Sequence, residues 1–195
     1  MSLSIFSGRL TLLSNTLYFF RKHFFIIIGL GLVAAFGRVI QLGGFGHIST
    51  LINILLEVVI EASRILLFLY VLGLANVKNG RRRIKHFFTK KNDRKAAVVL
   101  AMQKLKQQWL SFSLSVVGFL IIAWFINYLI DLLAYETCLY LTLKQDGILT
   151  ESSSEWTILL FFKNLTVIPL TLIFDAVLLL WLSARLSNFR KITLA

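Results

Sequence analysis

Four long apolar segments constrain this chain more than any other feature of its sequence. A helix needs about 20 mostly apolar residues to cross the hydrocarbon core of a bilayer. Segments of this kind occupy residues 24–41, 48–75, 109–134 and 156–184. We therefore expect an all-α membrane protein, a single domain over residues 1–195, whose four transmembrane helices form two antiparallel hairpins.

Composition argues against the soluble classes that compete with this interpretation. Of the 195 residues, 57% are hydrophobic, and the net charge is +12. A soluble domain of this size cannot bury so much apolar surface, which speaks against a cytosolic globular protein and an isolated nucleic-acid-binding domain. Cys138 is the single cysteine, so the sequence excludes an intrachain disulfide and a paired-cysteine metal site.

The basic residues predict the orientation of the spans. Of the 21 Lys and Arg residues, 17 lie before the first span, between the second and third spans, or after the fourth. Lys144 is the only Lys or Arg in the two segments on the opposite side. Because cytoplasmic segments carry the excess of Lys and Arg, we expect both termini in the cytoplasm. The Phe-, Ile-, Leu- and Lys-rich composition is typical of a bacterial protein and favours a bacterial inner membrane.

The segments outside the spans carry patterns of their own. Residues 2–20 have apolar side chains at near-helical spacing, which predicts an amphipathic helix leading into the first span. Residues 76–108 form a basic cytoplasmic loop, whose part from 93 to 108 is expected to be a helix that runs into the third span. On the other side, the glycine-rich segment 42–47 predicts a tight turn and residues 141–155 a polar loop.

Ionisable and polar side chains inside the expected spans are the first set of candidate functional residues. Such residues are costly in a bilayer, so they face protein or water and usually have a partner. On the second span, the spacing i, i+4, i+7 places Glu57, Glu61 and Arg64 on one helical face. The candidates for a polar network or a pore lining are Arg38, Glu57, Glu61, Arg64, Asn127, Asp131, Lys163 and Asp175.

Depth along the helices predicts which of these charges meet. Arg38 lies near the outer end of the first span, at the level of Glu57, so we expect the two to pair across the hairpin. Lys163 is expected at a depth where it meets Asp131 or Glu57. Glu61 lies near the middle of its span, the position best suited to an acid that takes up a proton.

Two interpretations of these charges stay open. Three bases nearly balance four acids, so the charges can form a structural network that fixes the register of the helices. They can instead line a polar path, such as a pore, a proton relay or a substrate site. One copy of four short helices can hardly enclose such a path, and small residues such as Gly31 and Ala35 are typical of helix association in lipid. We therefore expect a homo-oligomer.

The most concentrated charge follows the second span. Juxtamembrane basic runs of this kind bind the anionic headgroups of the lipid bilayer. The alternative is docking of a cytoplasmic protein or RNA, with Phe87 or Phe88 stacking on a base. Arg81 and His86 also fit the loose R-x4-H pattern of metal-independent ribonucleases, a match expected by chance in a run so rich in arginine. The docking candidates are Arg81, Arg82, Arg83, Lys85, Lys90 and Lys91.

The sequence carries no recognisable catalytic or cofactor motif. Its three histidines are scattered, without an HExxH pattern, and no glycine-rich phosphate loop follows a strand. We therefore expect no catalytic residue, no cofactor and no metal site. An intramembrane enzyme that uses Glu57, Glu61 and Asp131 as acid, base or metal ligands is an alternative.

In size, four-span layout and large basic loop, the chain resembles the small membrane accessory proteins encoded beside the RNA-targeting effectors of type VI-B CRISPR systems. The resemblance covers the whole layout but carries over no site residue, because no family motif matches position by position. It implies a role in antiviral defence at the inner membrane. The leading expectation is an oligomeric inner-membrane protein that forms or gates an ion-permeable path. A non-conducting anchor or scaffold that docks a partner through the basic loop is the alternative.

Overall fold

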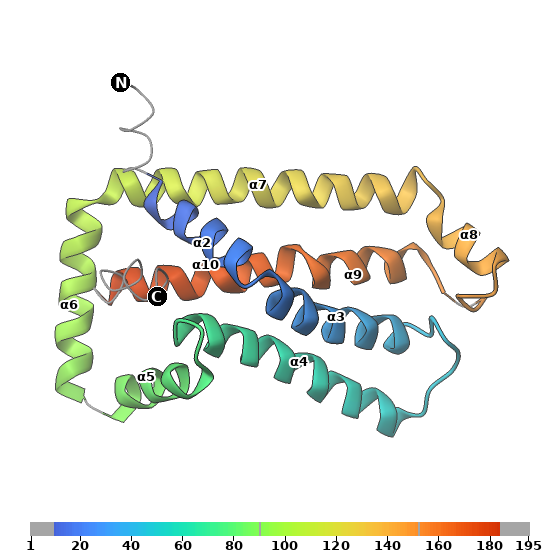
Figure 1. Ribbon diagram of the computed structural model, residues 1–195, viewed down its shortest axis with the longest axis horizontal. Coiled ribbons are helices and arrows are strands. Elements are labelled where there is room, and N and C mark those ends of the chain that lie inside the picture. Colours follow the sequence, from blue (N-terminus) through green and yellow to red (C-terminus); the bar gives the residue numbers. More distant parts are fainter. Residues whose placement is uncertain (1–9, 90, 152, 184–195) are drawn as a thin grey trace. The chain divides into compact units, whose positions relative to one another are not determined.

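A computed structural model describes residues 10–89, 91–151 and 153–183 of the chain (Figure 1). Helices make up 83% of the structure, and the three described ranges contain no strand, so the expected all-α class is confirmed. The helices of the described residues are α2 (Thr11–Lys22), α3 (Phe24–Gln41), α4 (Thr50–Leu72), α5 (Val77–Thr89), α6 (Lys91–Gln107), α7 (Trp109–Tyr135), α8 (Leu139–Gln145), α9 (Glu155–Leu165) and α10 (Val167–Leu182).

Three helical segments of the described chain are long and apolar enough to cross a membrane. They are α3, α7 and the stretch Glu155–Leu182 formed by α9 and α10. A fourth candidate combines α4 with Val77–His86 of α5, two helices that meet at a bend of 83°. The structure therefore contains three candidate spans, or four if the bent pair counts as one.

The expected fourth span is interrupted at Thr166. Pro169 lacks an N–H group, so it cannot donate the usual helical hydrogen bond to the carbonyl of Leu165. Thr166 leaves the helical conformation, with φ −123° and ψ −72°, and its hydroxyl donates to the carbonyl of Phe162 at 2.7 Å. The expected single helix over 156–184 is therefore two helices, and residues 184–195 lie outside the described chain.

Two segments expected to be loops contain helices. The basic stretch after the second span forms α5, and the polar outer loop over 141–155 begins inside α8. The expected helix over 93–108 is present as α6. Of the amphipathic helix expected over 2–20, α2 covers the described part, and residues 1–9 lie outside the described chain.

The chain divides into two compact units. The first takes its described residues from 1–22, 66–120 and 171–195, and the second from 23–65 and 121–170. α4, α7 and α10 contribute residues to both units.

In the first unit, aromatic side chains join the helices. Phe119 of α7 stacks on Phe174 of α10, with ring centroids 4.2 Å apart, and Phe19 of α2 meets Tyr70 of α4 edge-on at 6.0 Å. Lys104 of α6 donates a hydrogen bond of 2.7 Å to the carbonyl of Trp181, near the end of α10, and lies 4.8 Å from that residue's ring centroid. Burial lowers the pKa of Lys104.

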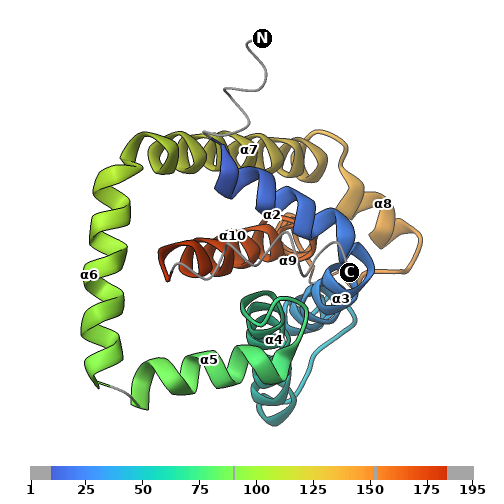
Figure 2. The same cartoon turned by 60° about the vertical axis from the view of Figure 1, so that its left-hand side comes forward.

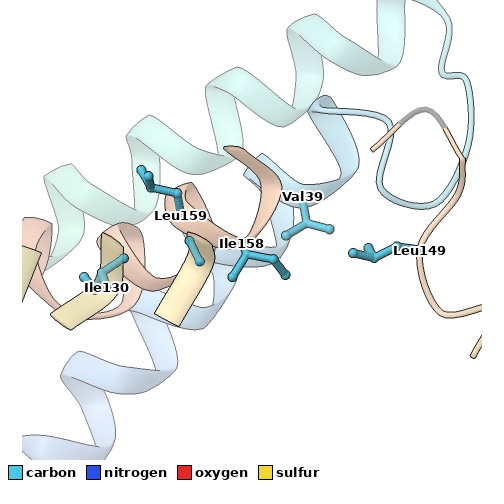
Figure 3. Close-up of a cluster of buried hydrophobic side chains, with 6 residues drawn as sticks. Val39, Ile130, Leu149, Ile158 and Leu159 are labelled. Atoms are coloured by element: carbon cyan, nitrogen blue, oxygen red, sulfur yellow. The ribbon is translucent and has the colours of Figure 1, made fainter. Parts of the chain in front are cut away.

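In the second unit, α3 packs along α9. Gly31 makes this approach close, because a Cβ there would lie 3.3 Å from the carbonyl oxygen of Asn164. Thr150 donates its N–H to the carbonyl of Gly44, which ties the segment between α8 and α9 to the segment between α3 and α4. The apolar cluster of this unit, five of whose members are labelled in Figure 3, comprises Val39, Ile130, Ala134, Leu149, Ile158 and Leu159.

Candidate functional site

The strongest polar feature is a network of charges within the second unit. Arg38, in the last turns of α3, donates two hydrogen bonds to the carboxylate of Glu57 on α4, at 2.8 and 3.0 Å. The expected pairing across the hairpin is therefore present. Gln41 lies one turn beyond Arg38 and accepts a bond from it at 2.8 Å. Its amide also donates to Glu57 at 3.0 Å, so Glu57 is bound from two positions of α3.

The network continues along α4 to α9. Glu61 lies 3.8 Å from Arg38 and accepts a hydrogen bond from Arg64. The other end of the Arg64 guanidinium donates to the side-chain oxygen of Asn164 at 2.7 Å, while its Nε is buried without a hydrogen-bond partner. Glu61 therefore has two basic neighbours, and a chain of polar contacts connects α3, α4 and α9.

Sequence reasoning missed two members of this network, Gln41 and Asn164. Asn164 is 1% exposed, and its amide nitrogen donates to the carbonyl of Leu160 at 2.8 Å. A neutral amide stands out less from an apolar sequence than a charge does. The cost of burying an unpaired amide inside a span could still have identified these residues, because it predicts a hydrogen-bond partner for each.

The remaining candidates from the expected spans make contacts outside this network. Lys163 of α9 lies 3.9 Å from Asp131 of α7, a separate and looser pair. Asn127 donates to the carbonyl of Ala123 on its own helix at 2.9 Å. Asp175 belongs to the first unit, where it is exposed.

The acids of this site are more open than the bases. The side chains of Glu57, Glu61 and Asp131 are 47%, 46% and 48% exposed. Arg38 and Arg64 are about half as exposed, at 25% and 21%. Each of these acidic side chains therefore contacts a base and is still about half exposed. The face of α4 that carries Glu61, here called the open face, also carries the exposed apolar residues Ile54, Val58 and Ile65 at helical spacing. Other exposed residues of α4, such as Leu55, Val59 and Leu66, extend around the helix from it.

The basic docking candidates fall on α5 or beside it. Arg81, Arg82 and Lys85 are exposed, and Arg83 turns back to donate a hydrogen bond to the carbonyl of Leu72. The structure adds Lys78, which is also exposed. Lys90 and the side chain of Lys91 lie outside the described residues.

Within the described ranges, no three His, Cys, Asp or Glu side chains come together as a metal site. Comparisons with protein-family models, curated proteins and solved structures find no match to this chain.

Proposed function

We propose that this chain is a non-enzymatic protein that assembles as an oligomer in a bacterial inner membrane and forms or gates an ion-permeable path. The observation that carries the proposal is the half-exposed state of three carboxylates, Glu57, Glu61 and Asp131, on helices that qualify as spans or as part of one. A charge at membrane depth is not left open to lipid. A water-filled path, a second copy of the chain, or both therefore cover these acids.

The open face of α4 is the proposed lining of the path. Glu57 and Glu61 lie one turn apart on this helix. Glu57 accepts a hydrogen bond from Arg38, and Glu61 accepts one from Arg64. Around the axis of an oligomer, such acids form rings, an arrangement that selects cations. The arginines hold the carboxylates in place rather than closing the path.

The proposed topology has four spans with both termini in the cytoplasm. It counts α4 as a span in spite of its three charges and α5 as a helix outside the hydrocarbon core. The distribution of bases supports it, because 17 of 21 Lys and Arg residues fall on one side of such an arrangement.

Ion flux tests this proposal directly. The purified chain is reconstituted into liposomes loaded with K⁺, and efflux is followed with an ion-selective electrode alongside single-channel recordings in planar bilayers. We expect cation flux that depends on the protein. A well-incorporated oligomer that releases no ions, alone or with a candidate cytoplasmic partner, contradicts the proposal.

Glu61→Gln tests the role of the central acid. The variant keeps the shape of the side chain and removes its negative charge, so we expect lower cation selectivity and a changed pH dependence of the conductance. Glu136→Gln, an exposed acid at the outer end of α7, is the matched control. If Glu61→Gln conducts with unchanged selectivity and pH dependence, Glu61 is not part of the path.

A scaffold that docks a cytoplasmic protein or RNA is the second candidate, favoured by the exposed bases of α5. Reversing the charges of Arg81 and Arg82 separates the two functions. Loss of partner recovery at normal membrane insertion and flux supports docking, whereas loss of flux alone supports the path. The resemblance in layout adds the proposal of a role in antiviral defence, which phage challenge of cells with and without the chain tests.

A further inference from the structure

A sharp elbow, residues 73–76, joins α4 to α5 (Figure 2). The N–H groups of Leu74 and Ala75 donate to the carbonyls of Val71 and Tyr70, both at 2.9 Å, which closes α4 with a Schellman motif. Leu74 and Ala75 have φ values of 56° and 69°, in the left-handed region. The two helices meet at 83°, so α5 runs almost perpendicular to α4.

Contacts on both sides of the elbow hold α5 at the last turns of α4. A Cβ at Gly80 would lie 2.0 Å from the carbonyl oxygen of Leu69, so this approach requires glycine. Arg83 donates to the carbonyl of Leu72 at 2.6 Å. Asn76 caps α5 by accepting the N–H of Asn79 at 3.2 Å. These contacts with the last turn of α4 therefore fix the direction of α5.

This orientation sorts the bases of α5 into two groups. Lys78, Arg81, Arg82 and Lys85 follow the spacing i, i+3, i+4, i+7 and are all exposed, so they form a single row, here called the basic row. Arg83 lies off the row and binds the end of α4. α5 contains no acidic residue that would neutralise the row.

We propose that the basic row binds anionic phospholipid headgroups in the leaflet where α4 ends, and that Arg83 is a structural residue of the elbow. The inference rests on that part of the proposed function in which α4 crosses the bilayer, and not on conduction. α5 meets α4 at Leu69 and Leu72, within its last turn. Long basic side chains at that level reach the headgroup phosphates.

The composition of the row favours lipid over single-stranded RNA. Proteins that bind single strands combine bases with aromatic side chains on which nucleobases stack. The stretch from Lys78 to Lys85 contains no aromatic residue, and the two phenylalanines of α5, Phe87 and Phe88, come after it. A row about 10 Å long, at 1.5 Å per residue, presents four positive charges to one patch of headgroups.

Lipid selectivity of the full chain tests the proposal. A fluorophore is attached to Thr89→Cys, at the end of α5, in a Cys138→Ala background, and the protein is reconstituted into phosphatidylcholine vesicles. Spin-labelled phosphatidylglycerol or spin-labelled phosphatidylcholine is then titrated in, and quenching gives the preference for the anionic lipid. We expect phosphatidylglycerol to be preferred, with the preference falling as salt is raised.

Arg81→Gln and Arg83→Gln form the matched pair, because each removes one charge from the same helix. At about 1 kcal/mol per base near an anionic surface, Arg81→Gln should lower the preference about fivefold. Arg83→Gln should lower the preference less than about twofold. The Arg83 charge lies off the row, farther from the headgroups, where salt screens its interaction with them. Replacing all four row residues by Gln should abolish the preference. This variant leaves Arg83 unchanged, so it tests the row even if Arg83→Gln is unstable.

Three outcomes overturn the proposal. They are equal quenching by the two lipids, an equal effect of Arg81→Gln and Arg83→Gln, and tight binding of a short single-stranded RNA that the row variant loses while lipid preference stays. Ion flux is measured on the same vesicles. A lipid preference without flux contradicts the proposed path alone, and flux without lipid preference contradicts this inference alone.

Discussion

At the scale of single residues, the ionic contacts of the second unit differ in quality. Arg38 and Glu57 form two hydrogen bonds in parallel, whereas Lys163 and Asp131 approach only to 3.9 Å. A planar guanidinium fixes a carboxylate in two places, and an ammonium does so at one point. The first pair should therefore determine how α3 and α4 fit together, and the second should contribute little.

A comparison of double-mutant cycles checks this difference. Replacing Arg38 and Glu57 by Gln, singly and together, should give a coupling free energy of about 1–2 kcal/mol. The same cycle on Lys163 and Asp131 should give about 0.5 kcal/mol or less, as for open ion pairs. Reversible unfolding in mixed detergent micelles measures both. Equal couplings would mean that the bidentate geometry does not persist.

The amide of Asn164 should stabilise the protein more than that of Asn127. Both donate to a carbonyl one turn earlier, but only Asn164 also accepts a bond from an arginine. We expect Asn164→Ala to lower the free energy of unfolding by about 2 kcal/mol, and Asn127→Ala by about 0.5 kcal/mol. The same micelle unfolding assay reports both variants. If Asn127→Ala lowers the free energy of unfolding as much as Asn164→Ala does, the hydrogen bond from Arg64 to Asn164 adds no measurable stability.

Lys104 gives a pH dependence of known sign. Burial lowers its pKa below the ordinary value of 10.5, so the folded chain releases this proton at a lower pH than the unfolded chain does. Between the two pKa values the unfolded chain binds more protons, and the free energy of unfolding therefore rises with pH towards about 10.5. Lys104→Met should remove this rise, whereas Lys106→Met, at an exposed position, should keep it. The measurement is the free energy of unfolding from pH 8 to 11. If it changes with pH in the same way for the wild type and Lys104→Met, the expectation is wrong.

At the scale of elements, the break between α9 and α10 and the elbow between α4 and α5 have different causes. The break between α9 and α10 follows from Pro169, which removes a helical donor. The elbow between α4 and α5 has no proline and places two residues other than glycine at positive φ. It depends on the close contact between Gly80 and Leu69 and on the Arg83 hydrogen bond. The cause of the first break is a residue visible in the sequence, although we expected a single helix there, whereas the elbow is a property of packing.

Gly80→Ala should disrupt the elbow. The added methyl group would lie 2.0 Å from the carbonyl oxygen of Leu69, backbone that cannot move aside without shifting α5. Overpacking of this kind costs about 1–3 kcal/mol. Gly29→Ala is the control, since a Cβ there meets nothing within 4 Å, and it should be neutral or stabilising. Pulsed spin-label distances between α4 and α5 should change in the first variant only. Unchanged distances in Gly80→Ala would exclude the close seating of α5.

At the scale of the whole molecule, the proposed path requires that the open acids be covered by water or by a second copy of the chain. The exposed face of α4 carries Val58 one turn before Glu61, and Val58 is 61% exposed. If copies meet across this face, a cysteine at Val58 approaches its counterpart. Ile121 of α7 is 60% exposed, and we expect it to face lipid in the same arrangement.

Cross-linking distinguishes these faces. In a Cys138→Ala background, Val58→Cys should form disulfide-linked dimers in native membranes under mild oxidation, and Ile121→Cys should form several-fold fewer. Non-reducing gels measure the linked fraction. Equal linkage at the two positions, or linkage at Ile121 alone, would place the contact between copies elsewhere and leave the open acids to be covered by water within one copy.

The sequence by itself determined the helical class, the positions of the apolar segments and the pairing of Arg38 with Glu57. These features follow from local composition and from helix geometry, which sets depth at a constant rise per residue. The tertiary structure decided that Gln41 and Asn164 complete the network, that Arg83 leaves the basic row, and that the stretch after α4 is a perpendicular helix. Each of these depends on which groups approach within hydrogen-bonding distance once the helices pack, and a residue's type and spacing do not contain that information.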